Sequence, residues 1–171
     1  MYERKEAAME FQKDAGLTAD GIVGTKTWAV LDEIKIYSLK ADGNKAISTN
    51  FKVKEFACKD KSDIIVIHED FVKGRLQPIR SHFGVPITIN SAYRSSSHNK
   101  KVGGPSNSFH MKGRAFDIVV KGKTPAEVAW YAASIGIKGV IQYSWGVHVD
   151  SRVVKYWAVD KNNKKTAVTG F

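Results

Sequence analysis

Residues 94–113 form a polar stretch, rich in serine, glycine and asparagine, that separates two apolar segments. These segments, PITINSAY at residues 86–93 and AFDIVV at residues 115–120, have the composition of strands, and the second has the pattern of a mostly buried strand. A connection of this length is uncommon in a compact domain unless it serves a function. The fold therefore has to accommodate two strands joined by a long loop, and a functional site is expected in that loop.

Apolar residues at helical spacing predict several helices around these strands. The clearest covers TPAEVAWYAASIG at residues 124–136, where Thr124 is the expected N-cap and Glu127 completes a capping box. Two further strands are expected at residues 139–144 and 145–152. The other expected helices are at residues 3–15, at residues 25–34 with Thr25 as the cap, and at residues 69–84, where Pro78 marks a kink or a new turn.

The charge of the chain is unevenly distributed. Lys and Arg number 27 against 17 Asp and Glu, a formal net charge of +10. Residues 1–57 contain 9 basic and 9 acidic side chains, so the whole excess lies in residues 58–171, which contain 18 and 8. Such a charge favours an anionic partner and governs encounter rather than fold. Because the basic residues are scattered and match no known reading element, nucleic acid is not the expected partner.

Composition excludes several other classes of protein. Hydrophobic residues make up 43% of the chain, enough for a sizeable core, which excludes wholesale disorder. The single cysteine, Cys58, excludes an internal disulfide framework and a structural zinc held by several thiolates, so any metal must use histidine and carboxylate ligands. No run approaches the roughly 18 apolar residues of a membrane span, and the N-terminus has no recognisable secretion signal. The sequence thus predicts a chain made in the cytoplasm, with no membrane insertion.

Three residues combine into a candidate metal site. His110 and Asp117 flank a turn in HMKGRAFD, where Gly113 allows the chain to reverse before Asp117 enters the following strand. His148 on a later strand can supply a third ligand. Two imidazoles and one carboxylate are zinc ligands, and three of them leave a fourth position for water, as in a catalytic site. The spacing alone is a weak pattern that fits equally a loop histidine, a turn acceptor and a buried, hydrogen-bonded histidine.

The sequence around these residues resembles the zinc D-Ala-D-Ala carboxypeptidase and L-alanoyl-D-glutamate endopeptidase family. The segments that carry the resemblance are SAYRSSSHNKKVGGPSNSFHMKGRAFDI and the later GVHVDSR. The resemblance covers roughly residues 51–157. It implies an α+β fold, a small antiparallel sheet with flanking helices as in the hedgehog signalling domain, here preceded by a short N-terminal helical hairpin. The family hallmark S-x-H-x-x-G-x-A-x-D is matched completely by Ser108, His110, Gly113, Ala115 and Asp117.

The resemblance also assigns roles to individual residues. It implies that His110, Asp117 and His148 bind Zn²⁺, which makes hydroxide available near neutral pH for attack on an amide carbonyl. Arg94 corresponds to an arginine that faces the substrate in the family. An arginine there can pair with a carboxylate of the peptide or assist the developing oxyanion, which lysine would do less well.

The general base is where this sequence departs from part of the family. Many members have Glu or Asp three residues before the last histidine ligand, a position occupied here by Trp145. Asp150 is the best local candidate for the general base, because it shares a strand face with His148 and its side chain can point toward the metal. Some relatives carry His-x-His with the second histidine on the metal. In that alternative register Asp150 binds zinc and His148 lies beside it.

Residues 7–31 resemble the second half of a small helical peptidoglycan-binding domain. The resemblance rests on the segment that begins at Phe11, FQKDAGLTADGIVGTKTW, and the earlier helix of that domain has no counterpart in these residues. The expected organisation is therefore a partial peptidoglycan-binding segment at residues 1–33, a linker at residues 34–50 and a zinc peptidase domain at residues 51–171.

The function expected from these features is a zinc-dependent peptidase that cuts the stem peptides of bacterial peptidoglycan, as a D,D-carboxypeptidase or an endopeptidase. Its charge would hold it near anionic wall polymers, and it is expected to be a monomer acting at the cell wall. A phage endolysin would fit the missing secretion signal, as would a longer parent protein with its own signal. The alternative is a non-catalytic, zinc-containing wall-binding module.

Overall fold

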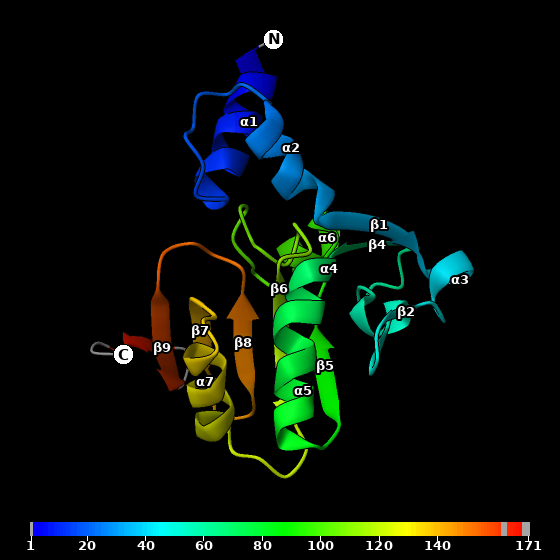
Figure 1. The fold of residues 1–171 in the computed structure, drawn as a ribbon, viewed down its shortest axis with the longest axis vertical. Helices are drawn as coiled ribbons and strands as arrows, with labels where there is room; N and C mark the ends of the chain where they lie inside the picture. The colour runs from blue at the N-terminus through cyan, green and yellow to red at the C-terminus, as the bar shows by residue number, and fades with distance from the viewer. Residues whose placement is uncertain (1, 162–163, 169–171) are drawn as a thin grey trace.

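The computed structural model describes residues 2–161 and 164–168. The largest sheet of the described residues has six strands in the order β10-β9-β7-β8-β6-β5, and helices α5 and α7 cover one face of it (Figure 1). The helices are α1 (Tyr2–Asp14), α2 (Thr25–Asp32), α3 (Leu39–Asp42), α4 (Glu69–Phe71), α5 (Gln77–Phe83), α6 (Ser96–Lys101) and α7 (Pro125–Ser134). The strands are β1 (Ile34–Ser38), β2 (Ala46–Ser48), β3 (Phe51–Lys52), β4 (Ile64–His68), β5 (Ile87–Ser91), β6 (Ala115–Val120), β7 (Gly139–Gln142), β8 (Val147–Asp150), β9 (Tyr156–Lys161) and β10 (Lys164–Ala167).

The sheet confirms a mixed fold of strands and helices, with one departure from the expected antiparallel arrangement. Strands β5, β6, β8 and β7 pair antiparallel in turn, and β9 pairs antiparallel with β10. Strand β7, however, pairs parallel with β9. The tight turn between β7 and β8 brings the chain straight back. Strand β8 ends at Asp150 and β9 begins at Tyr156, and both residues pair with Gly139, so residues 151–155 cross the end of β7 and β9 runs in the same direction as β7.

The core lies between the sheet and its covering helices. Alternate residues of β6 and β8 point toward it, among them Phe116, Ile118, Val147 and Val149, none of which is exposed. Helices α5 and α7 contribute apolar faces from the other side. Because side chains alternate along a strand, the residues between these apolar positions point to the opposite face. On β6 and β8 those residues are Asp117, His148 and Asp150.

Helix α7 has the expected capping box, in which the Thr124 side chain accepts from the Glu127 backbone. The expected helix at residues 69–84 is a succession of α4, a π-helical turn η2 (Val72–Leu76) and α5, with Pro78 in the first turn of α5. The prediction of Thr25 as the cap of α2 is wrong, because Gly24 occupies the N-cap and no side chain caps this helix.

The interpretation of residues 34–50 as a linker has to be corrected. Strand β1 in this segment pairs with β4, and β2 pairs with β3, which a short 3-10 turn η1 (Val53–Phe56) follows. Tyr37 and Ile47 are buried in the core. The segment is polar because it consists of short strands and turns, and strand pairing together with Tyr37, Ile47 and the partly buried Leu39 holds it against the domain.

The hairpin of α1 and α2 lies at one end of the molecule, next to the loops that flank β6 and β8 (Figure 1). Glu10 pairs with Lys112 at 3.5 Å, and a Cβ on Gly16 would lie 2.8 Å from Val153, so the two parts are in direct contact. Among the described residues, no helix combines the length and the apolar character needed to cross a membrane.

Candidate metal centre

Two paired strands and one turn hold the three candidate ligands. Asp117 on β6 and His148 on β8 are direct partners in the strand register, so their side chains leave the sheet side by side. His110 reaches them from the turn before β6. That turn requires glycine at Gly113, which has φ +67° and whose Cβ would lie 2.4 Å from the Val66 carbonyl oxygen. The sequence therefore folds the turn tightly against β4 and aims His110 at the end of β6.

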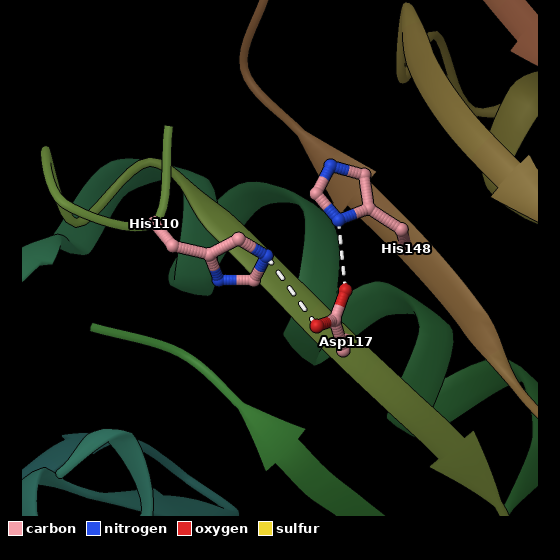
Figure 2. A group of neighbouring side chains, drawn as sticks. All are labelled: His110, Asp117 and His148. Atoms are coloured by element: carbon pink, nitrogen blue, oxygen red, sulfur yellow. Dashed lines mark hydrogen bonds and ion pairs between the residues drawn. The ribbon is translucent and has the colours of Figure 1, made fainter. Parts of the chain in front are cut away.

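The three side chains converge on one point (Figure 2). Their ligand atoms all lie within 4.8 Å of one another, and all three residues are buried. The Asp117 carboxylate lies between the two imidazoles, 2.8 Å from His148 Nδ1 and 3.4 Å from His110 Nε2. Two nitrogens and a carboxylate oxygen around one point are the donors of a zinc site that keeps positions for water and substrate. The residues present thus fit a metal ion.

The second nitrogen of each imidazole has its own partner. His110 Nδ1 lies 2.7 Å from the Ala92 carbonyl oxygen, and His148 Nε2 lies 3.0 Å from Asp150 Oδ2. Metal-binding histidines are held in this way, because an acceptor on one nitrogen fixes the tautomer that leaves the other nitrogen for the metal. The contacts therefore select His110 Nε2 and His148 Nδ1 as the atoms that face the metal position.

Burial and charge strongly shift the ionisation of this group. Burial raises the pKa of Asp117, but hydrogen bonds from His110 and His148 outweigh it and hold that pKa well below its usual range. Burial lowers the pKa of His148, whereas Asp117 and Asp150 outweigh it by hydrogen bonding and by their charge, and raise it to about 9. A protonated His148 between two carboxylates is thus the stable form of the metal-free site. Metal binding has to displace that proton.

Asp150 is fully buried and closely held. Besides His148, it accepts from the Arg152 backbone N–H at 3.0 Å and from the Arg152 guanidinium at 2.5–3.1 Å. The guanidinium in turn lies over the rings of Phe109 and Tyr156, 5.6 and 4.8 Å from their centroids. A Cβ at position 139 would lie 1.9 Å from Asp150 Oδ1, so only glycine fits beside this carboxylate.

Arg94 faces the same site from the loop after β5. Its Nη2 donates to Asp117 Oδ2 at 2.8 Å, and its Nε donates to Ser91 Oγ at 2.9 Å. Arg94 lines a cavity of about 290 Å³ together with the three candidate ligands and Tyr143. Burial, helped by the charges of Asp117 and Asp160, raises the pKa of Tyr143 to about 12, so this side chain keeps its proton.

The structure brings His110, Asp117 and His148 together and places Arg94 beside them, whereas Asp150 lies behind His148, outside the converging group. Sequence reasoning missed Arg152, Gly139 and Phe109. A signal for Arg152 was present, because it follows Asp150 by two residues in VDSR, but only the fold shows that the chain turns it back onto that carboxylate. Cys58 is buried beside Ser95 and away from this cavity.

Comparisons with known proteins agree with this geometry. Residues 49–150 match the sequence model of the family described as Peptidase M15, and residues 5–31 match that of a putative peptidoglycan binding domain. A zinc D-Ala-D-Ala carboxypeptidase from Streptomyces albus G is 30% identical over 158 residues. That alignment covers 85% of this chain but 58% of the relative, so the chain spans little more than half of the relative's length. The resemblance to both families of sequence is confirmed, and the chain belongs to the Peptidase M15 family.

Proposed function

We propose that this chain is a zinc-dependent peptidase that hydrolyses the stem peptides of bacterial peptidoglycan. The observation that carries the proposal is the convergence of His110, Asp117 and His148 within 4.8 Å at the wall of a cavity that also contains an arginine. Membership of the Peptidase M15 family supports a peptidase, and the name of the Streptomyces albus G relative supports zinc and a D-Ala-containing peptide.

His110, Asp117 and His148 would hold Zn²⁺, which would supply a Lewis acid for the scissile carbonyl and a water with its pKa lowered to about 7. The side chains around the metal position supply the other catalytic groups. Arg94 holds the Asp117 carboxylate through one nitrogen and is within reach of a substrate in the cavity, where its charge stabilises a developing oxyanion. Tyr143, which keeps its proton, presents a hydroxyl donor to the same cavity.

Asp150 was expected from the sequence to be the general base, and its contacts favour a different role. Its oxygens accept from His148 and from Arg152, and none of its surface is exposed. A carboxylate held in this way orients the imidazole and fixes a proton on Nε2, which leaves Nδ1 to face the metal. We propose that Asp150 positions His148, and that Arg152 keeps Asp150 ionised and in place.

The experiment that tests the proposed function is digestion of purified peptidoglycan by the protein as isolated, after treatment with a chelator and after restoration of zinc, with the fragments identified by mass spectrometry. Fragments that disappear on chelation and return with zinc support the peptidase. Intact peptidoglycan of several chemotypes, in the presence of confirmed bound zinc, would instead favour a non-catalytic wall-binding module.

The wider setting is also a proposal. We propose a division into a partial peptidoglycan-binding segment at residues 1–33 and a peptidase domain of hedgehog-like arrangement at residues 51–171, with residues 34–50 packed on the latter. The protein would act at the cell wall as a monomer, held near anionic polymers by its charge of +10. Lysis of bacteria when the protein is produced together with a phage pore protein, but not alone, would support the role of an endolysin.

A further inference from the structure

A second cavity lies where the end of α7 meets the starts of β7 and β9 (Figure 1). Its volume is about 310 Å³, against about 290 Å³ for the cavity that contains the three candidate ligands, and none of the described residues lines both. It is therefore a separate feature of the molecule. Its lining includes four apolar residues and two lysines: Trp130, Ala133, Ile137, Trp157, Lys138 and Lys155.

Two tryptophans form the apolar wall of this cavity. The rings of Trp130 on α7 and Trp157 on β9 meet edge to face, with centroids 5.8 Å apart and planes at 89°. Trp157 is buried in the core, whereas 65% of Trp130 is exposed. Because the core holds Trp157, its contact also holds the Trp130 ring beside the cavity. The apolar wall is thus preformed, as is usual for a site that takes an apolar group.

The charge of the cavity comes from its two lysines. Lys138 directly precedes β7 and Lys155 directly precedes β9, and both are exposed. The backbone keeps the two positions together, because the Tyr156 N–H donates to the Lys138 carbonyl at 2.7 Å. None of the described residues that line the cavity is acidic. A ligand that combines an apolar body with a negative group is therefore complementary to this cavity.

An acyl chain with an anionic head group has this combination. The chain would lose apolar surface to water against the two tryptophans, and a phosphate would pair with the lysines. The surroundings favour a membrane lipid over a free fatty acid. Val154, which directly precedes Lys155, is 73% exposed, and exposed tryptophan and lysine side chains suit the boundary between acyl chains and head groups. The excess of basic side chains in residues 58–171 adds attraction to an anionic surface.

We propose that this cavity binds the acyl chain of an anionic phospholipid, with the lipid phosphate at Lys138 and Lys155, so that the protein docks on an anionic membrane surface without spanning it. The binding is non-covalent and reversible, as expected for a single chain combined with a few basic side chains. It goes beyond the proposed hydrolysis and depends on neither the metal nor the cleavage of a peptide.

The first test is sedimentation of the whole protein with vesicles of phosphatidylglycerol and phosphatidylcholine in equal amounts. Trp130→Ala should lower the partition coefficient about tenfold, and Trp130→Phe, which keeps a ring against Trp157, should lower it less. The matched control is Trp28→Ala, which removes a tryptophan that is 56% exposed on α2 and should leave the partition coefficient unchanged. Unchanged binding by Trp130→Ala, or an equal loss in Trp28→Ala, overturns the proposal.

A pair of variants with the same net charge tests the role of the lysines. Lys138→Gln should lower the partition coefficient about fivefold, the effect of one lysine close to an anionic surface, whereas the exposed Lys26→Gln on α2 should change it little. Equal effects of the two substitutions would show attraction by net charge alone and contradict a site.

The source of the ligand is tested with decyl phosphate, a free amphiphile, below the concentration at which it forms micelles. In titration calorimetry it should bind the wild type and Trp28→Ala about tenfold more tightly than Trp130→Ala, and it should displace the protein from the vesicles. Binding of decyl phosphate without binding to vesicles would overturn the membrane surface as the partner. All of these measurements use the metal-free protein as well as the zinc-loaded protein, so they stand whether or not either form hydrolyses peptidoglycan.

Discussion

The helical hairpin and the metal centre are both organised by one buried polar side chain, but by different means. In the hairpin, the neutral amide of Gln12 donates to Asp20, Ile22 and Thr27 and accepts from Gly21, all within 15 positions of the chain. In the metal centre, the charged Asp117 joins Arg94, His110 and His148, up to 31 positions away, through the register of two strands. A local neutral network can form wherever its own segment folds, whereas the charged one exists only when the sheet is complete.

The two networks therefore differ in the free-energy cost of removing one of their members. An amide that loses a partner leaves a hydrogen bond unmade, at a cost of about 1–3 kcal/mol. A buried carboxylate that loses its positively charged partner costs far more free energy, and it is expected to take up a proton.

The largest effect is expected at the ligands. His148→Ala should empty the metal site, because it removes a ligand and leaves Asp117 and Asp150 facing each other. Asp150→Asn should retain zinc with an affinity lowered about 10- to 100-fold, because it loosens the orientation of His148 only. Zinc stoichiometry and affinity measure both, with His82→Ala as the control, since that exposed ring stacks on Tyr131 away from the site.

The opposite result in that pair would reassign the residues. If Asp150→Asn empties the site and His148→Ala keeps the metal, Asp150 is the ligand. A kcat lowered by Asp150→Asn with zinc affinity unchanged would restore Asp150 as the general base.

The next effect concerns Arg94. Arg94→Lys should retain zinc but lose activity about 10²- to 10³-fold, because a lysine cannot donate to Ser91 and Asp117 together and still present charge to the substrate. Single-turnover hydrolysis and zinc analysis on the same preparation measure this. Normal turnover by this variant would remove Arg94 from the mechanism.

The pH dependence of stability should differ between the metal-free and the zinc-loaded protein. The pKa of His148 is raised to about 9 from an ordinary 6.5, so its contribution to the metal-free fold is complete below pH 6.5 and is lost as the pH rises through 9, a decrease of roughly 3 kcal/mol. The lowered pKa values of Asp117 and Asp150 act in the other direction, because their contribution is lost as the pH falls below about 4.

Zinc should reverse the alkaline part of this profile. Since imidazoles bind metal only when neutral, the stabilisation by zinc should grow between pH 6 and 9. Denaturant unfolding with and without chelator across this range measures both. A metal-free protein whose stability is constant from pH 6.5 to 9 would contradict a protonated His148 between the two carboxylates.

The smallest effect is expected in the hairpin. Gln12→Ala should destabilise the hairpin by about 2 kcal/mol and speed amide exchange in residues 5–31, while zinc affinity changes less than twofold. Lys13→Ala, an exposed change in the same helix, is the control. A large loss of zinc affinity in Gln12→Ala would show that the hairpin supports the site through its contacts with Lys112 and Val153.

The same contrast explains which features could be predicted from the sequence. The capping box of α7 and the alternation that puts His148 and Asp150 on one face are local, and both are confirmed. The pairing of Asp117 with His148 depends on the antiparallel register of β6 and β8, which no local pattern contains, so the sequence offered only a weak spacing and a family resemblance.

The features that the sequence did not reveal arise from contacts across the chain. Residues 34–50 look like a linker because few of their side chains belong to the core: Tyr37 and Ile47 are buried in it and Leu39 packs against it, a role that appears only once the rest of the domain surrounds them. The need for glycine at Gly139 follows from the position of Asp150 on the neighbouring strand. Nothing in the sequence around Gly139 indicates this contact.

We propose that one zinc ion is held by two imidazoles and one carboxylate from three separate segments of the chain. Anomalous diffraction at the zinc edge, on crystals of the zinc-loaded protein, tests it most directly. We expect a single strong peak about 2.0–2.2 Å from His110 Nε2, His148 Nδ1 and an Asp117 oxygen, with His148 Nε2 still hydrogen-bonded to Asp150. A peak on Asp150, or no peak between these three residues, would contradict it.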